Sequence, residues 1–168
     1  LVRSPGEIDR ALQTFLRLEA NSWKGAAGTA CLSTQADATF VREMVSGLAL
    51  HGNAIISELR CGGRVVASAL NLTAGKSFFA FKIGWDPEFV SVGPGILHEC
   101  ELMMQSPEVL QEFSLIDSCS GENSYLADYW PERISVGRVV ICWSSVSGLA
   151  LRLTDAARSV KRLVCSIW

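Results

Sequence analysis

The chain has 168 residues, of which 49% are apolar and 19% are charged, and its net charge is −2. This composition suits a single folded domain with a sizeable core and excludes a disordered tail. The small net charge argues against a nucleic-acid-binding surface, and no apolar run approaches the roughly 20 residues that a membrane-spanning helix needs. We therefore expect no nucleic acid partner and no membrane span.

The cysteines and the first residue bear on the cellular setting. Six cysteines are dispersed along the chain without a Cys-x-x-Cys pair, and several lie inside apolar runs. This pattern indicates reduced core thiols in a cytoplasmic protein rather than a disulfide framework or a zinc site. No spacing of residues suggests metal ligands, so no metal is expected. Because the chain begins with Leu1 rather than Met, we interpret it as a fragment of a longer protein.

Two helices are predicted before the first strand. The first covers residues 6–22, with Ser4 as its N-cap and Pro5 at the first helical position. A loop rich in small residues separates it from a second helix over 38–51, for which Asp37 is the predicted cap. Each helix carries an apolar stripe at helical spacing, which is typical of a helix that packs on a core.

Three strands follow in quick succession, over residues 54–61, 64–72 and 78–85. Gly62-Gly63 is a two-residue hairpin turn, and a second tight turn joins the next two strands, so the three are predicted to form an antiparallel meander. The third strand is mostly apolar on both faces, which indicates a central position in the sheet. After it, Gly93-Pro94-Gly95 opens a helix that is predicted to continue to about Met104.

The remaining elements alternate between strand and helix. We predict a strand, a short helix, a strand and a last amphipathic helix over residues 113–119, 124–129, 134–143 and 149–164. Strand, helix and strand after a meander favour an α/β (α+β) fold, in which a mixed, mostly antiparallel twisted sheet carries helices on both faces.

The glycine-rich turn before the third helix is a candidate anion site. Such a turn presents unpaired backbone N–H groups at the positive end of a helix dipole, where phosphate is readily held. Pro94 itself contributes no N–H group. The predicted phosphate-binding backbone is that of Val92, Gly93, Gly95, Ile96 and Leu97.

Several sequence blocks together are similar to one family. The blocks are Phe15 to Glu19, Ser22-Trp23-Lys24-Gly25, Gly28-Thr29-Ala30, Phe40, Lys82-Ile83-Gly84-Trp85-Asp86-Pro87, Gly93-Pro94-Gly95, Ile116-Asp117-Ser118 and Trp130-Pro131-Glu132-Arg133. In this order and spacing they resemble the GNAT acyltransferase superfamily, and more narrowly the acetyltransferase domain of the cellulose-biosynthesis type, which is related to the Fem-type aminoacyl transferases. The likeness spans roughly residues 8–160. It implies a GNAT-like fold whose co-substrate is acetyl-CoA or another acyl-CoA.

Two charged residues of the third strand are candidates for the chemistry of such an enzyme. Lys82 and Asp86 lie four residues apart on one strand face, in so apolar a setting that each must be paired, solvated or functional. Asp86 could remove a proton from the acceptor, and Lys82 could contact an anionic group of the substrate. The alternatives are that the two side chains form a structural ion pair or that they contact solvent at the end of the strand.

Further candidates follow the later strand. Asp117 ends that strand, where ligands of open sheets bind, and it could orient the substrate or act as a base; alternatively, it caps the following turn. The resemblance implies that Tyr125, on the short helix, is the acid that protonates the departing thiolate. Its alternative role is aromatic packing. His98, in the first turn of the third helix, is expected to be neutral; it could be a base beside the acyl site, or a polar surface or interface residue.

The end of the first helix is a candidate acceptor site. The resemblance implies that Trp23 and Lys24 shape the acceptor pocket there. The alternative interpretation places Trp23 in the core and Lys24 in solvent.

Taken with the resemblance, these residues favour an acyltransferase that moves an acetyl or other acyl group from acyl-CoA directly to an amine or hydroxyl acceptor. The resemblance implies cell-surface polysaccharide biosynthesis as the context, with an unknown small-molecule or saccharide acceptor, and a homodimer or a second GNAT-like half in the parent chain. Two alternatives stay open. One is a Fem-type aminoacyl transferase that uses charged tRNA, and the other is a catalytically silent GNAT-like module that supports assembly or binds carbohydrate.

Overall fold

The computed structural model describes residues 1–121, 124–130 and 132–135. The chain divides into two units, Leu1–Pro131 and Glu132–Trp168, and the architecture below is that of the first. The helix predicted over 149–164 lies outside the described residues. Of the strand predicted over 134–143, only residues 134 and 135 are described.

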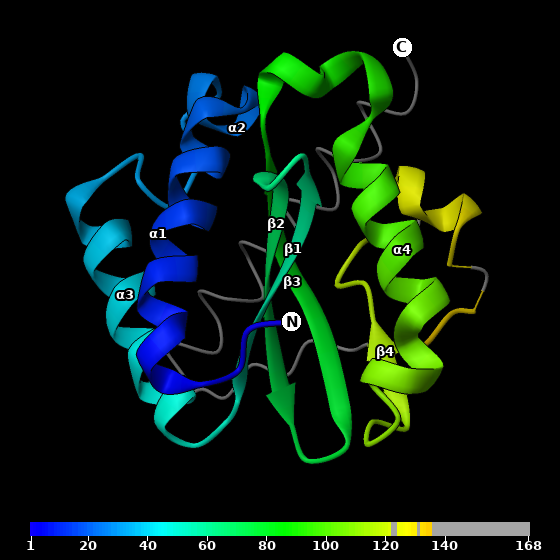
Figure 1. Cartoon of the computed structure of the whole chain (residues 1–168). Coiled ribbons are helices and arrows are strands. Elements are labelled where there is room, and N and C mark those ends of the chain that lie inside the picture. The colour runs from blue at the N-terminus through cyan, green and yellow to red at the C-terminus, as the bar shows by residue number, and fades with distance from the viewer. Residues whose placement is uncertain (122–123, 131, 136–168) are drawn as a thin grey trace, which may run out of the picture. The chain divides into compact units, whose positions relative to one another are not determined.

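The centre of the first unit is a four-stranded sheet in the order β1-β2-β3-β4 (Figure 1). β1 (Ala54–Cys61), β2 (Arg64–Ala74) and β3 (Ser77–Trp85) form the predicted antiparallel meander. β4 (Leu115–Asp117) is shorter than predicted and pairs with β3 in parallel. The sheet is therefore mixed and mostly antiparallel.

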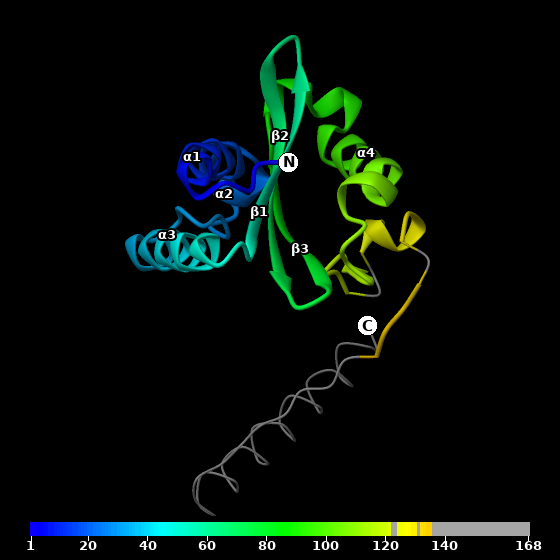
Figure 2. The ribbon, with the colours of Figure 1, turned by 60° about the horizontal axis from the view of Figure 1, so that its bottom comes forward.

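Helices cover both faces of this sheet (Figure 2). One face carries α1 (Pro5–Asn21), the short α2 (Trp23–Ala26) and α3 (Gln35–Leu50), and the other face carries α4 (Pro94–Val109). Two 3-10 helices complete the unit, η1 (Pro87–Val92) and η2 (Tyr125–Asp128). The predicted fold class is confirmed.

Two helix boundaries differ from the prediction by three residues or more. α3 begins at Gln35, because Thr34 and not Asp37 is its N-cap: the Thr34 hydroxyl accepts the N–H of Asp37 at 3.1 Å and donates to the Asp37 carboxylate at 2.7 Å. The predicted cap is therefore wrong by one turn, since Asp37 fills the reciprocal position of a capping box. α4 continues beyond Met104 to Val109.

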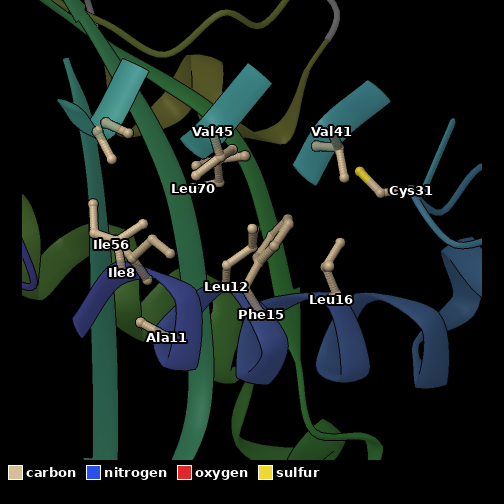
Figure 3. Close-up of a cluster of buried hydrophobic side chains, with 12 residues drawn as sticks. Ile8, Ala11, Leu12, Phe15, Leu16, Cys31, Val41, Val45, Ile56 and Leu70 are labelled. Carbon is tan, nitrogen blue, oxygen red and sulfur yellow. The ribbon is translucent and has the colours of Figure 1, made fainter. Parts of the chain in front are cut away.

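Each face of the sheet has its own hydrophobic core. The larger core lies between the sheet, α1 and α3, and Figure 3 shows its side chains interleaving, among them Phe15 of α1, Val45 of α3 and Leu70 of β2. The smaller core lies on the α4 side and consists of Ile55, Phe78, Leu102 and Leu110. Neighbouring residues of β1 thus contribute to opposite cores, as the alternation of a strand requires.

Candidate active site

In the described part of the chain, β3 and β4 pair only at the start of β3. The paired residues are Ser77 with Leu115, Phe78 with Ile116 and Phe79 with Asp117. Beyond Phe79, β3 continues to Trp85 with β2 on one side, so its other edge is not paired with β4. An open strand edge presents backbone N–H and C=O groups that an extended ligand can use.

Separate sequence blocks meet at this open half of β3. Lys82 Nζ donates to Glu19 Oε1 at 3.0 Å and to the carbonyl oxygen of Thr29 at 3.2 Å. Lys24 Nζ donates to the carbonyl oxygen of Ile83 at 2.7 Å. The blocks that contain Lys24, Thr29 and Lys82 therefore come together around Glu19. We call Glu19, Lys24, Cys31 and Lys82 the Glu19 cluster.

Two glycines allow this close packing. A Cβ on Gly84 would lie 2.5 Å from the backbone nitrogen of Glu19, and a Cβ on Gly25 would lie 1.8 Å from the carbonyl oxygen of Ala20. Both separations are shorter than atoms can approach. The absence of a side chain at Gly84 lets the end of α1 press against β3, and its absence at Gly25 lets the chain turn sharply into α2.

Glu19 is fully buried, and both of its carboxylate oxygens have partners. Oε1 accepts from Lys82, and Oε2 accepts the backbone N–H of Cys31 at 2.8 Å. Such a carboxylate is well stabilised despite its burial, because burying a charge is costly only when it is left unpaired. Glu19 therefore fixes Lys82 and the loop at Cys31 relative to one another.

The cluster changes the proton affinity of its members. Burial lowers the pKa of Lys82, but the hydrogen bond and the charge of Glu19 outweigh burial, so the pKa is raised overall and the ammonium stays charged. Burial lowers the pKa of Lys24 more than Glu19 raises it, and the charge of Lys82 adds to the lowering. Burial, together with the hydrogen bond and charge of Glu19, raises the pKa of Cys31 to about 11. The Cys31 thiol is consequently protonated at neutral pH.

The structure reverses the alternative interpretation of Trp23 and Lys24. Trp23 is 60% exposed, whereas the Lys24 ammonium is partly buried against β3. The reason is that Ser22 caps α2 by accepting the N–H of Lys24. This cap begins a new helix immediately after α1, with Trp23 facing solvent and Lys24 facing the strand.

Asp86 is not paired with Lys82. Its carboxylate forms an ion pair with Arg64 and accepts the N–H of Glu88 at 3.1 Å, as the N-cap of η1. Arg64 also contacts the Glu88 carboxylate at 2.8 Å. The alternative of an ion pair between Lys82 and Asp86 is therefore wrong, because β3 ends at Trp85 and Asp86 already belongs to the turn into η1.

The turn at the start of α4 lies next to the open half of β3. A Cβ on Gly95 would lie 3.1 Å from Cδ1 of Trp85, so the backbone of the turn packs directly on the end of β3. Gly93 has a φ of 61°, in the left-handed region that favours glycine. This conformation ends η1 and begins α4 within one residue.

Some predicted phosphate donors of this turn are used internally. The N–H of Gly93 donates to the carbonyl of Val90 at 3.1 Å, and that of Leu97 to the carbonyl of Gly93 at 3.0 Å. Since Pro94 has no N–H and the first amides of a helix have no intrahelical acceptor, the donors left in the first turn of α4 are those of Gly95 and Ile96. Val92, the fifth predicted residue, belongs to η1.

The remaining predicted residues occupy different settings. Asp117 lies where β3 and β4 part, and its Oδ1 accepts the N–H of Cys119 at 2.8 Å, so it caps the following turn. Tyr125 begins η2, but its side chain lies outside what the structure describes. His98 is buried, because α4 turns this side toward the sheet, so a position on the open surface is wrong.

Glu19 ends one of the blocks that carry the resemblance, but the sequence analysis gave it no chemical role. It follows the apolar positions of α1 at helical spacing, so a charged residue stands where the pattern calls for a core residue. A buried charge needs a partner, and this was the available signal.

The described residues contain no group of three or more His, Cys, Asp or Glu placed to hold a metal ion. Within the same residues, no helix is both long and apolar enough to cross a membrane.

An open strand edge beside a helix N-terminus, with a cationic cluster along that edge, defines an α/β domain suited to group transfer from a phosphate-bearing co-substrate. The family model described as Acetyltransferase (GNAT) domain matches residues 2–126, and the chain belongs to this family. No curated protein matches the chain. Membership supports acyl transfer as the class of reaction and acetyl-CoA as the co-substrate, in line with the sequence analysis.

Proposed function

We propose that this chain is an acyl-CoA-dependent acyltransferase whose reaction takes place along the open half of β3. One observation supports this most strongly: the Glu19 cluster and the α4 turn border the same short stretch of strand. Lys24 binds the carbonyl of Ile83, and Gly95 packs against Trp85 two residues further on. A phosphate-holding turn and a cationic group are thus available to one extended co-substrate.

The residues present fit acyl-CoA. The amides of Gly95 and Ile96 would hold its pyrophosphate at the positive end of α4, and the free edge of β3 would hold its amide-containing arm. The co-substrate supplies an acyl group activated as a thioester. The protein contributes position and charge, which is where much of the rate of acyl transfer originates.

Lys24 is placed to stabilise negative charge on the acyl oxygen. An ammonium has three N–H donors, and one of those on Lys24 binds the carbonyl of Ile83. The others are available at the strand edge. Lys82 is the proposed contact for the acceptor, and Trp23, which is exposed, stays a proposed acceptor contact from the resemblance.

Transfer is proposed to be direct, from thioester to amine or hydroxyl. The pKa of Cys31, about 11, keeps this thiol protonated and a poor nucleophile. We retain Asp117 as the proposed base, because it lies where the strands part, and Tyr125 as the proposed acid. Asp86 is a weaker candidate for the base, because both of its oxygens already have partners, the N–H of Glu88 in the turn and the Arg64 guanidinium of β2.

The biological setting is proposed from the resemblance alone. It would be a cytoplasmic step of cell-surface polysaccharide biosynthesis, within the cellulose-biosynthesis type of acetyltransferase. A Fem-type activity and a catalytically silent module are the alternatives that the following experiment separates.

The experiment compares thermal stabilisation by acetyl-CoA with that by S-acetyl-N-acetylcysteamine, which carries the same thioester without phosphates. A ligand at a concentration of about one hundred times its Kd stabilises the folded state by about 2.7 kcal/mol, so acetyl-CoA is expected to raise Tm by several degrees, and the truncated thioester by much less. Absence of stabilisation at millimolar acetyl-CoA would contradict the proposal. Stabilisation by aminoacyl-tRNA alone would favour the Fem-type activity.

The role of Lys24 is tested by Lys24→Met, with the exposed Lys76→Met as the matched control. Loss of one oxyanion donor typically lowers kcat by about 10²–10³-fold. We expect this loss in the release of free CoA in the presence of a pool of small amines and alcohols, with acetyl-CoA binding retained. Equal rates for the two variants would remove Lys24 from the mechanism. Binding of acetyl-CoA without any turnover would favour the silent module.

A further inference from the structure

A pocket of about 240 Å³ opens on the α3 side of the sheet, beside the Glu19 cluster. Its walls come from the loop before α3, from α3 itself and from β3, through Gly28, Thr29, Ala30, Cys31, Asp37, Phe40, Val41, Met44, Phe81 and Lys82. Figure 3 shows the Cys31 sulfur directed toward Val41, both of which line this pocket. The volume lies just below the range of about 300–1,000 Å³ typical of ligand sites, so the occupant is small.

A β-bulge gives this pocket an apolar group next to a cation. Along the β2–β3 pair, Leu70 faces Lys82 and Asn71 faces Ala80, so Phe81 has no partner on β2. A bulge of this kind turns neighbouring side chains toward the same face of a sheet, and Phe81 and Lys82 both line the pocket. Phe40 supplies a second aromatic wall and is 65% exposed.

Besides its two oxygen acceptors, the Lys82 ammonium contacts the Cys31 thiol, whose sulfur is only a weak acceptor. Two of its three N–H groups bind Glu19 and the carbonyl of Thr29, and its side chain is still 29% exposed at the pocket. Glu19 is the only carboxylate that the structure shows in contact with this ammonium among the described residues. Lys24 adds a second positive charge. It lies close enough to Lys82 that, in addition to burial, the charge of Lys82 lowers the pKa of Lys24. Two ammonium groups therefore stand against one carboxylate.

Asp37 is the acidic residue that also faces the pocket, and it does not supply the missing negative charge. Its carboxylate accepts from the hydroxyl of Thr34, and it lies in the first turn of α3, where the helix dipole stabilises an anion. The Asp37 carboxylate is thus stabilised at its own end of the pocket and forms no ion pair with Lys82 in the described structure. The end at Lys82 remains positive.

We propose that this pocket binds the acyl acceptor, and that the acceptor is a small molecule with a carboxylate on a flat apolar body. The carboxylate accepts from Lys82, and the apolar body lies between Phe40 and Phe81. That this ligand is the acyl acceptor rests on the function proposed above. Its recognition as a small carboxylate with an apolar body rests on the pocket alone.

The test compares two probes of equal shape, phenylacetate and phenylacetamide, in the absence of any CoA compound. A hydrogen bond to a charged partner is worth about 1.5–3 kcal/mol, so phenylacetate is expected to bind about tenfold tighter or more, as measured by ligand-observed NMR titration. Phenylacetate is also expected to protect the Cys31 thiol from a neutral alkylating reagent at alkaline pH. Equal affinities, no binding of either probe at millimolar concentration, or absence of Cys31 protection would overturn the proposal.

Three variants test which side chains cause the preference for phenylacetate over phenylacetamide. Lys82→Met should abolish the difference between the two probes, and Lys76→Met should keep it. Phe40→Ala, at an exposed position that leaves the core intact, should weaken both probes by a similar factor and keep the tenfold preference. A preference that survives Lys82→Met, or a Phe40→Ala variant that binds both probes as tightly as the unmodified chain, would also overturn it. Because CoA is absent, failure here leaves the acetyl-CoA result standing, and failure of acetyl-CoA binding leaves this result standing.

Discussion

The two faces of the sheet bury a carboxylate in opposite ways. On the α1 face, Glu19 is fully buried and both of its oxygens accept hydrogen bonds. On the α4 face, Glu99 is 4% exposed and, among the described residues, its Oε2 has no hydrogen-bond partner. Its Oε1 lies 3.8 Å from Nδ1 of the buried His98, and that nitrogen also lacks a hydrogen bond within the described structure.

This difference separates a charge that organises a site from a charge that weakens a helix contact. Glu19 joins α1, the loop at Cys31 and β3, and it lies beside the larger of the two cores. Glu99 shares its helix face with the smaller core, and among the described residues its one ionisable partner is the adjacent His98. Because a buried polar atom without a partner costs roughly 1–3 kcal/mol, the α1 face should be the rigid support of the site and the α4 face the less stable one.

The largest expected effect comes from filling the contact between α1 and β3. Gly84→Ala would place a Cβ 2.5 Å from the backbone of Glu19, where only movement of the whole helix relieves the clash. We expect a loss of about 3 kcal/mol in the free energy of unfolding, the upper part of the range for overpacking, as measured by denaturant titration. The control is Gly47→Ala on the exposed side of α3, where a Cβ meets nothing within 4 Å. That change should stabilise the chain by up to about 1 kcal/mol. Similar effects of the two substitutions would refute the close-contact account.

The second effect concerns the Glu19–Lys82 pair. Breaking a buried ion pair costs about 3–5 kcal/mol, but Lys82 is 29% exposed and can recover water. We therefore expect Glu19→Leu to destabilise by about 2 kcal/mol, a value discounted from that range. In the double variant with Lys82→Met most of this loss should be regained, because an apolar pair replaces the ions. A double-mutant cycle in guanidinium measures this coupling; strictly additive losses would show that the two side chains act independently.

The third prediction is that a Glu-to-Leu substitution on the α4 face raises the stability of the chain instead of lowering it. Glu99→Leu removes a buried oxygen that has no partner among the described residues and adds apolar surface beside Leu102. We expect it to stabilise the chain by about 1 kcal/mol, the lower end of the cost of an unsatisfied buried group. The same Glu-to-Leu change thus has opposite effects on the two faces. A loss of stability at Glu99 would mean that this carboxylate is as well supported as Glu19.

Local sequence signals predicted the strands well and the site only in part. The Gly62-Gly63 turn and the alternation around it gave β1 its observed bounds, because hairpins are encoded by neighbouring residues. The Glu19–Lys82 contact joins residues 63 positions apart. No periodicity reports such a contact, and it depends on the missing side chain at Gly84.

The directions of Trp23, Lys24 and Asp86 could not be predicted for a related reason. Each lies at the end of an element, and its direction depends on one cap, either Ser22 for α2 or Asp86 itself for η1. Element ends are where sequence patterns are weakest. The point at which β3 and β4 stop pairing, at Phe79 and Asp117, is likewise not indicated by any residue type in the sequence.

The smallest expected effect tests the electrostatics of the α1 face without altering its packing. Glu19→Gln keeps the shape of the side chain but removes the charge that, after burial, raises the pKa of Cys31 to about 11. Without it, the positive charge of Lys82 lowers that pKa, so the thiolate forms at lower pH. In the unmodified chain, the alkylation rate of Cys31 should keep rising with pH until about 11, whereas in Glu19→Gln the rate should level off at a lower pH.

The exposed Cys61 serves as an internal control in both proteins. Burial slows alkylation of Cys31 at every pH, but the pH at which the rate levels off depends on proton affinity and not on access. Mass spectrometry of each peptide across a pH series therefore isolates the charge of Glu19, and identical profiles in the two proteins would show that this charge does not reach Cys31.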